Sequence, residues 1–338
     1  MFSGLEPAIT NLMKEIGCRR FSLDRIPGSA NNQVFRIETD CRPFLLKVYF
    51  RHPADTRDRL GAEFEFLRFA WDQGLRCIPE PLRCDGTLSL GLYEFVEGRR
   101  PEPEEIGENE VRQAADFFLE LNLHKKKTEA SGLPVASEAC FSIGSHMQCV
   151  KRRLQRLEKI TSSSPVDLDA RDFIQNDLMR VWVKTRRSID DKGREKGLSI
   201  DTGLDLDERC ISPSDFGFHN TLLTPAGKLR FLDFEYAGWD DPAKMICDFF
   251  CQPAVPVPLK HYGWFSMMVT SGWQAQEQIL ARSSILLPLY QIKWCCIVLN
   301  DFLCEGNARR EFAGSTEDHE SRKALQLQKA QALLARLE

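Results

Sequence analysis

The stretch SDFGFHNTLLTPAGKLRFLDFEY, residues 214–236, decides the fold, because it places polar side chains at both ends of a predicted hairpin. Two short apolar runs flank the cluster Pro-Ala-Gly at 225–227, a pattern typical of antiparallel strands joined by a turn. The midpoint between Asn220 and Asp233 falls between the last two residues of this cluster. Antiparallel pairing therefore predicts that Asn220 lies directly opposite Asp233.

This opposed pair predicts a site for a divalent cation. Facing residues of antiparallel strands lie about 5 Å apart, so an amide oxygen and a carboxylate can reach one hard cation such as Mg²⁺. Asp215, in the irregular segment before the hairpin, would stand beside the ion, and its position suits a base better than a third ligand. The alternative is that Asn220 and Asp233 only cap turns, as these residue types often do.

The first hundred residues predict a small sheet that carries one helix. Runs rich in β-branched and aromatic residues occupy 34–38, 44–50 and 88–96. Between the last two runs, apolar residues recur at helical spacing across 57–74, where a glycine ends the pattern.

Lys47 interrupts the apolar run FLLKVYF, and a buried cation needs an anionic partner. The partner is either a phosphate or a carboxylate of the following helix, where Glu63 and Glu65 are the candidates; an exposed lysine with solvated glutamates is the plain alternative.

The loop PGSANNQ, which contains Gly28, permits close approach of the backbone to a phosphate, although an ordinary hairpin turn explains it equally well. YEFVEG, residues 93–98, is extended and can offer backbone hydrogen bonds to a nucleotide base.

The remainder of the chain predicts mostly helices. Helical periodicity or apolar helix-length runs occupy 108–124, 147–160, 173–189, 286–303 and 320–338. The proline-rich acidic run at 99–105 predicts the boundary between two lobes, 1–98 and 99–338. The segment 141–200 is long enough to shape an acceptor surface, but its purpose is left open.

Composition narrows the classes of partner and compartment. The 45 basic and 49 acidic residues give a net charge of −4, which argues against a nucleic-acid partner. We expect no signal peptide, no segment long enough to cross a membrane and no membrane partner. Twelve cysteines without a paired CxxC motif favour a reducing cytoplasm. Buried thiols, rather than zinc ligands, are expected at Cys247, Cys251, Cys295, Cys296 and Cys304.

A lysine strand, a helix glutamate, an extended hinge, Asp-x-x-x-x-Asn and Asp-Phe-Glu follow one another in this order. With them the chain resembles the aminoglycoside phosphotransferase and choline kinase superfamily over residues 20–250, most specifically in SDFGFHNTLLTPAGKLRFLDFEYAGWDDP. The resemblance implies an α+β, bilobal protein-kinase-like fold. The small antiparallel-sheet lobe with one helix, 1–98, would bind the nucleotide, and the larger, mostly helical lobe, 99–338, would be catalytic and bind the acceptor.

The resemblance also implies roles for individual residues. Asp215 would accept the proton of an acceptor hydroxyl, while Asn220 and Asp233 would hold Mg²⁺. Lys47 would contact the α- and β-phosphates of ATP, steadied by Glu63, because the family's glutamate usually stands four residues before a core leucine. Further nucleotide contacts would come from a phosphate loop and an adenine-facing hinge: Gly28, Ser29, Asn31 and Asn32; Glu94, Phe95 and Val96.

Two features depart from the family pattern. Pro213 stands where the family usually has a histidine, two residues before the base, and a proline cannot donate that histidine's hydrogen bonds. His219 lies at the wrong position to substitute and is interpreted as structural. Glu235 replaces the glycine of protein kinases and, as in choline kinases, points to a small-molecule acceptor.

The predicted function is ATP-dependent transfer of the γ-phosphate to a hydroxyl of an amino sugar, sugar, aminoglycoside or amino alcohol. A non-catalytic nucleotide-binding pseudokinase or interaction protein on the same scaffold is the alternative, and a kinase of protein or RNA is a third. The acceptor, the choice between ATP and GTP, and the oligomeric state are left open.

Two groups of residues suggest a cationic acceptor but have simpler explanations. Asp240, Asp241 and Asp248 could attract a cation, yet Asp241 before a proline more often opens a helix. Four tryptophans could cage a quaternary amine, although core packing is the simpler explanation: Trp239, Trp264, Trp273 and Trp294.

Overall fold

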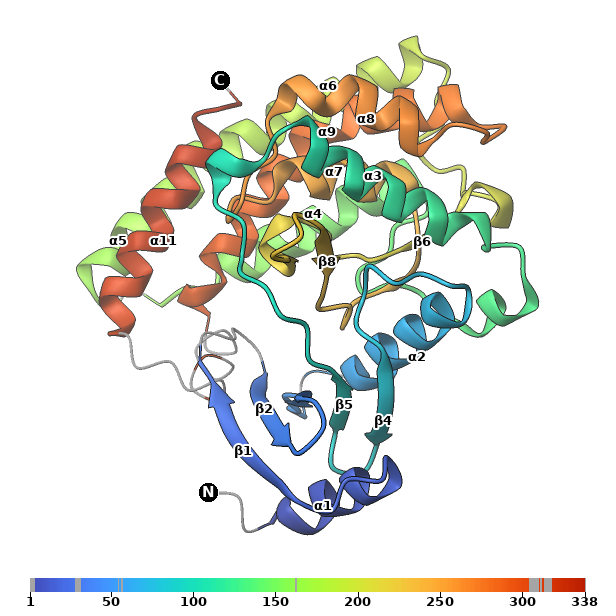
Figure 1. Cartoon of the computed structure of the whole chain (residues 1–338). Coiled ribbons are helices and arrows are strands. Elements are labelled where there is room, and N and C mark those ends of the chain that lie inside the picture. The colour runs from blue at the N-terminus through green and yellow to red at the C-terminus, as the bar shows by residue number, and fades with distance from the viewer. Residues whose placement is uncertain are drawn as a thin grey trace.

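The computed structural model describes residues 4–27, 32–53, 55, 57–161, 163–303, 310, 312 and 318–337. Its small lobe, at the bottom of Figure 1, holds a five-stranded antiparallel sheet in the order β1-β2-β3-β5-β4. The elements of this lobe are α1 (Glu6–Glu15), β1 (Phe21–Ile26), β2 (Gln33–Thr39), β3 (Phe44–Val48), α2 (Arg59–Asp72), β4 (Pro81–Asp85) and β5 (Leu90–Glu94).

The prediction of one helix in this lobe is wrong, because α1 is a second one. Its Ile9, Leu12 and Met13 recur at helical spacing, and all three are buried. They join a core that also contains Phe35 and Leu46 from β2 and β3. The helix therefore closes the sheet on a side where the sequence interpretation placed nothing.

The large lobe is mostly helical, as expected, and its helices fill the upper part of Figure 1. Its longer helices are α3 (Glu108–Leu123), α4 (Ile143–Leu157), α5 (Pro165–Asp172), α6 (Met179–Glu195), α7 (Pro242–Cys251), α8 (Tyr262–Val269), α9 (Gln276–Val298) and α11 (His319–Leu334). Its short strands are β6 (Cys210–Ser212), β7 (Thr221–Leu223), β8 (Leu229–Phe231) and β9 (Gly238–Asp240). Together with the five-stranded sheet, these elements confirm the predicted α+β class.

Helix α9 is the centre of the large lobe, since α4, α6, α7 and α11 all pack against it. The span Gln276–Phe302 is long and apolar enough to cross a membrane by length and composition, so the expectation that no segment is long enough was wrong. In the fold, however, 61% of its most apolar window is buried inside the protein. A helix that is apolar on all sides is the expected core of such a bundle.

The segment that connects the two lobes forms backbone hydrogen bonds with the β7–β8 hairpin. Arg99 and Leu223 exchange two backbone hydrogen bonds, of 3.1 Å and 2.7 Å. The predicted boundary between residues 98 and 99 lies in this connection. The hairpin that carries the candidate magnesium ligands is thus fastened directly to the segment that joins the lobes.

The hairpin itself forms, but its register differs from the prediction by one residue. Thr221 pairs with Phe231 and Leu223 with Leu229, and the backbone N–H of Leu232 donates to the carbonyl of Asn220 at 2.9 Å. Asn220 therefore faces Leu232 and not Asp233. The reason is a loop of three residues, 225–227, where the prediction assumed an even number, and the third of them is a glycine with φ of 72°.

Gly227→Ala should lower the free energy of unfolding by about 1 kcal/mol, because an L-residue is disfavoured in this left-handed conformation. A methyl group there would meet no atom within 4 Å, so the effect should be conformational alone. Chemical denaturation measures it, with Gly132→Ala as the matched control, since that glycine also has open space and lacks a positive φ. Equal effects of the two substitutions would contradict the assignment.

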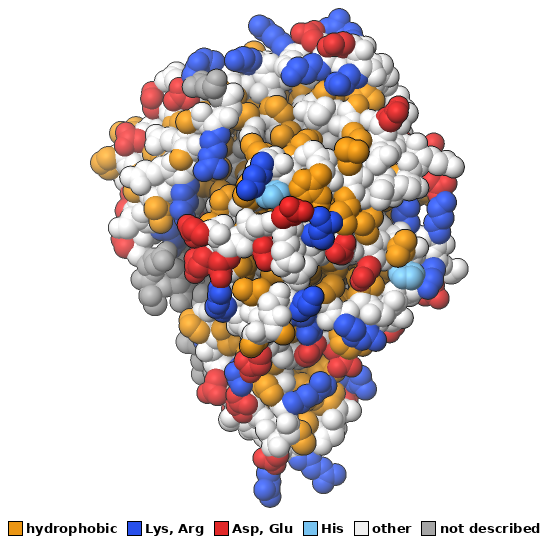
Figure 2. Space-filling view, turned by 45° about the horizontal axis from the view of Figure 1, so that its top comes forward, with side chains coloured by type: hydrophobic (Ala, Val, Ile, Leu, Met, Phe, Trp, Pro, Cys, Tyr) orange, Lys and Arg blue, Asp and Glu red, His pale blue; other side chains and the backbone are white. Residues whose placement is uncertain are grey.

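The surface carries charges of both signs, and the cysteines that the structure describes are not bonded to one another. On the face shown in Figure 2, basic and acidic side chains are interspersed. All eleven cysteines that the structure describes are free. Cys247, Cys251, Cys295 and Cys296 are buried as expected, while Cys304 lies outside the described residues. Within the described part of the chain, no group of three or more His, Cys, Asp or Glu could hold a metal ion.

Candidate active site

Alternating aromatic residues hold the two polar motifs in place. In SDFGFHN, Phe216 and Phe218 are buried and both pack against Phe249 of α7, with ring centroids 5.0 Å and 5.5 Å away. Phe234 of the second motif stacks on Phe66 of α2 with centroids 4.6 Å apart. Because these rings point into the core, the polar residues between them are turned towards the junction of the lobes.

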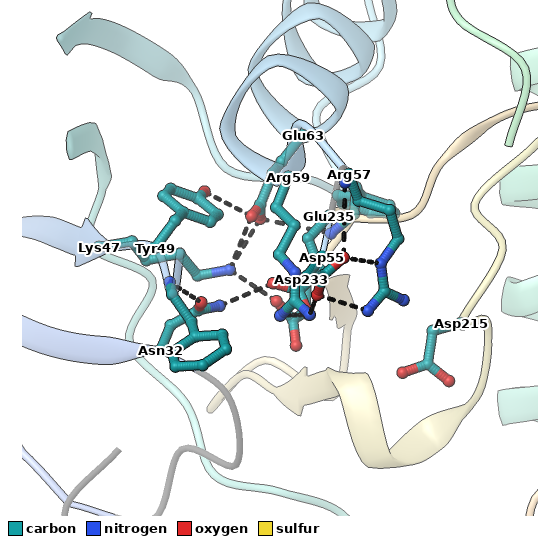
Figure 3. Close-up of polar contacts among 12 residues, drawn as sticks. Asn32, Lys47, Tyr49, Asp55, Arg57, Arg59, Glu63, Asp215, Asp233 and Glu235 are labelled. Atoms are coloured by element: carbon teal, nitrogen blue, oxygen red, sulfur yellow. Dashed lines mark hydrogen bonds and ion pairs between the residues drawn. The ribbon is translucent and has the colours of Figure 1, made fainter. Parts of the chain in front are cut away.

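Lys47, Glu63 and Asp233 meet where the two lobes join (Figure 3). The Lys47 ammonium lies 2.8 Å and 2.9 Å from the two Glu63 carboxylate oxygens and 2.7 Å from Asp233 Oδ1. Burial alone would lower the pKa of Lys47, but the charges of Asp233 and Glu63 outweigh it and raise that pKa above its ordinary value. The structure brings Glu63 to the lysine, whereas Glu65 pairs with Arg68 at the surface.

Two further groups donate hydrogen bonds to Glu63. Tyr49 donates its hydroxyl to Oε2 at 2.5 Å, and its oxygen lies 2.7 Å from that of Tyr93. The backbone N–H of Phe234 donates to Oε1 at 3.3 Å. These contacts join β3, α2 and the segment after Asp233 into one rigid unit, which preorganises the lysine.

Asp215 lies in the large lobe, to the right of this unit in Figure 3. Its Oδ1 is 3.3 Å from His219 Nε2, and Asn220 donates its Nδ2 to the Asp215 carbonyl at 3.0 Å and to Oδ2 at 3.3 Å. Burial alone would raise the pKa of Asp215, but the charge of His219 and the hydrogen bonds from His219 and Asn220 outweigh it and lower that pKa. The carboxylate is therefore ionised and able to accept a proton.

The residue before Asp215 carries backbone strain. Ser214 has φ of 66°, as has Asp233 at the end of the hairpin. Non-glycine residues in this left-handed region are uncommon and concentrate at functional sites. The conformation of Asp233 redirects its carboxylate to Lys47, which a continuing strand would not do.

The observed register changes how the two predicted magnesium ligands lie relative to each other. Asn220 and Asp233 are diagonal neighbours at the open end of the hairpin, since Asn220 faces Leu232. The Asn220 amide nitrogen points to Asp215, which leaves its Oδ1 for another partner. Asp233 and Asn220 thus still offer oxygen donors, the chemistry that Mg²⁺ prefers, and phosphates and waters commonly supply its other ligands.

The loop that was predicted to cover the phosphates is described only at its end. Gly28, Ser29 and Asn31 lie outside the described residues, whereas Asn32 is buried. Asn32 donates its Nδ2 to Glu235 Oε2 at 2.8 Å and accepts the backbone N–H of Phe50 at 3.3 Å. Its amide therefore links the loop to the acidic residue that follows Asp233.

The carboxylate of Glu94, the first residue of the predicted hinge, already has hydrogen-bond partners within the protein. Glu94 accepts from Arg230 at 2.7 Å and from the backbone N–H of Glu80 at 3.2 Å, and its own N–H donates to the Glu80 carbonyl. Phe95 lies under the Arg36 guanidinium, 4.4 Å from its ring centroid. Among the main-chain hydrogen bonds of the described residues, none involves Phe95 or Val96.

The acidic residues after the hairpin are neutralised within the protein. Asp241 begins α7, accepts the backbone N–H of Ala243 at 2.8 Å, and pairs with Arg282 and His146. This confirms the expected helix-capping role. Asp240 pairs with Lys244, and Asp248 with Lys293, so neither presents an uncompensated charge to a cationic acceptor.

The four tryptophans are all partly buried against the main core. The indole N–H groups of Trp239, Trp264 and Trp294 donate to Ala130, His261 and Asp248. Trp273 lies beneath the Lys125 ammonium, 3.4 Å from the ring centroid. Packing and these contacts account for their positions.

Sequence reasoning missed Tyr49 and Arg59, and it did not anticipate the contact between His219 and Asp215. Tyr49 was detectable, since it follows Lys47 by two residues, directly after the end of β3, and alternation along an extended chain turns both side chains the same way. Arg59, which pairs with Asp55 and Glu235, gave no local signal because Glu235 is remote in sequence. His219 was noticed but interpreted as structural, because only its distance along the chain was considered.

Comparisons with known proteins identify the family and the fold of the chain. A model of the phosphotransferase enzyme family matches residues 22–262. No curated protein matches significantly. Choline kinase from Cryptosporidium parvum is 13% identical, with a TM-score of 0.57 over 98% of this chain and 97% of that one. A choline/ethanolamine kinase family protein from Mesorhizobium loti is 16% identical, with a TM-score of 0.57 and 98% of each chain covered.

Spectinomycin phosphotransferase, in complex with ADP and spectinomycin, is 12% identical, with a TM-score of 0.59 over 97% of this chain and 98% of that one. These likenesses confirm the predicted kinase-like fold. The family match spans more than half of the chain and confirms the expected superfamily. The chain belongs to the phosphotransferase enzyme family.

Proposed function

We propose that the protein transfers the γ-phosphate of ATP to a hydroxyl group of a small molecule. The observation that carries the proposal is the union of Lys47, Glu63 and Asp233 across the two lobes, with Asp215 and Asn220 hydrogen-bonded beside it. A set of this kind supplies a cation, oxygen ligands for a metal ion and a base in one place, which is what phosphoryl transfer requires.

In the proposed mechanism, Lys47 holds the α- and β-phosphates and Asp215 orients the acceptor hydroxyl. The hydroxyl oxygen bonds to the γ-phosphorus, the bond from that phosphorus to the bridging oxygen breaks, and the hydroxyl proton passes to Asp215. Asn220 and Asp233 would hold Mg²⁺, which would neutralise charge on the phosphate oxygens. Gly28, Ser29, Asn31 and Asn32 would cover the phosphates, and Glu94, Phe95 and Val96 would meet the adenine.

ADP release in the presence of MgATP tests the proposal. The acceptor panel consists of amino sugars, neutral sugars, aminoglycosides and amino alcohols, with a parallel series in MgGTP. Turnover with at least one acceptor, above hydrolysis without acceptor, supports the proposal. Binding of MgATP without turnover on any acceptor would favour the alternative, a nucleotide-binding protein that kept the scaffold.

Glu63→Gln should lower kcat/KM for ATP roughly 10-fold or more, because it removes a charged partner from the buried Lys47. The matched control is Glu65→Gln, which lies on the same helix but pairs with Arg68 at the surface and should change kcat/KM little. Steady-state kinetics with varied ATP compares the two. Similar losses in both variants would show that Lys47 does not depend on Glu63.

A further inference from the structure

His219 makes a hydrogen bond to the proposed base that the family pattern would not predict. Its Nε2 lies 3.3 Å from Asp215 Oδ1, and Asn220 Nδ2 lies 3.3 Å from Oδ2. Each oxygen of the carboxylate therefore has one donor, one on either side. Both distances are long for hydrogen bonds, as is common at catalytic sites without ligands.

The imidazole is held in place by close packing against the backbone. A methyl group on Gly217 would lie 2.8 Å from His219 Nδ1 and 2.9 Å from Gln252 Cγ. Phe216 and Phe218, on either side of this glycine, are buried. The backbone N–H of Asn220 donates to the Gly217 carbonyl at 3.0 Å and closes the short turn that carries His219 back towards Asp215.

The hydrogen-bonding pattern identifies which nitrogen serves the carboxylate. An ionised carboxylate only accepts, so Nε2 must carry the hydrogen of this bond. His219 Nδ1 is buried and has no hydrogen-bond partner among the described residues. The imidazole therefore directs its one described hydrogen bond to Asp215.

The position that usually holds the family's histidine cannot perform this task. Pro213, two residues before the base, is buried and has no side-chain donor. We propose that His219 is the positioning residue for Asp215, holding the carboxylate in the orientation that receives the acceptor proton. This inference rests on the proposed role of Asp215.

Three variants separate positioning from general support of the fold. His219→Phe keeps a ring but removes the donor, and we expect kcat to fall about 10- to 100-fold. His219→Gln restores an N–H donor and should recover part of that loss. Gly217→Ala keeps His219 but displaces it, because the added methyl group would lie 2.8 Å from His219 Nδ1. The backbone itself accepts alanine, since φ at this residue is 173°. This variant should resemble His219→Phe.

The measurements use MgATP with the acceptor of highest turnover in the panel. All three variants should keep the KM for ATP within about twofold and the wild-type melting temperature within a few degrees. Unchanged kcat in His219→Phe, or equal losses in His219→Phe and His219→Gln, would overturn the inference.

A readout without turnover keeps the inference separate from the proposed function. In the ¹H–¹⁵N spectrum of the histidine side chains, His219 should carry its proton on Nε2, and this resonance should shift in Asp215→Asn. The signal is assigned by its loss in His219→Gln. The inference would be overturned if His219 carried a proton on Nδ1 and none on Nε2, or if its Nε2 resonance were unaffected by Asp215→Asn. Either result would count even if no acceptor is found. Failure of every acceptor in the panel would bear only on the proposed function.

Discussion

Asp215→Asn is expected to lower kcat by about 10²- to 10⁴-fold, the contribution typical of a general base. Asparagine has nearly the same shape and can still accept from His219, but it cannot take the acceptor proton. The Asp215 carbonyl, which accepts from Asn220 at 3.0 Å, is untouched by the substitution. Steady-state rates with the best acceptor measure the loss.

The control for this variant is nucleotide binding. MgATP affinity, measured by calorimetry, should remain close to wild type, because the lysine, its glutamate partner and Asp233 are all unchanged. Retention of more than a tenth of the wild-type kcat would place the base elsewhere. A matched loss of MgATP affinity and kcat would instead indicate that the loop had collapsed.

Asp241→Asn should destabilise the protein by about 3–5 kcal/mol, because it leaves the buried charge of Arg282 without its counter-charge. Arg282 donates to both carboxylate oxygens, at 2.7 Å and 2.8 Å, and His146 Nε2 lies 3.0 Å from one of them. The side chain of Asp241 is fully buried. Denaturant unfolding measures the difference.

Asp191→Asn is the matched control for this stability prediction. Asp191 also pairs with an arginine, Arg194, but the side chains are 71% and 77% exposed, so the change should be within about 1 kcal/mol. If the two substitutions shift the unfolding midpoint equally, the buried pair has no special importance.

The contribution of Asp241 should also depend on pH. Burial alone would raise its pKa, but Arg282 and His146 outweigh burial and hold the pKa well below the ordinary range. A folded-state pKa below the unfolded value, about 3.9, means that the stabilisation is complete above that value and is lost as the pH falls below it. The difference between wild type and Asp241→Asn should thus shrink as the pH falls below about pH 4.

The sequence was most informative where local pattern and chemistry coincide. Lys47 in an apolar strand was expected to need an anion, because a buried ammonium requires one within reach. The residues alone left Glu63 and Glu65 open, and the resemblance to the family selected Glu63, which the structure places against Lys47. The hairpin was predicted from its apolar runs and turn residues. Its register was not, because one glycine in a left-handed conformation adds a residue to the loop without altering the apolar pattern.

Contacts between distant segments could not be predicted in the same way. The partner of Asp241 is Arg282, 41 residues away, and that of Asn32 is Glu235, 203 residues away. Such pairs depend on how helices and lobes pack, which single-residue patterns do not specify. Strand β4, with its proline and charged residues, gave a similarly weak local signal.

The ammonium of Lys47 lies directly against Asp233, one of the two proposed magnesium ligands. A divalent ion without nucleotide would have to compete with the Lys47 ammonium for Asp233. An ion that binds together with a triphosphate gives that ammonium a new anionic partner, the phosphates. We therefore expect metal to enter together with nucleotide and to bind weakly without it. A single buried lysine would in this way determine the order in which the two ligands bind.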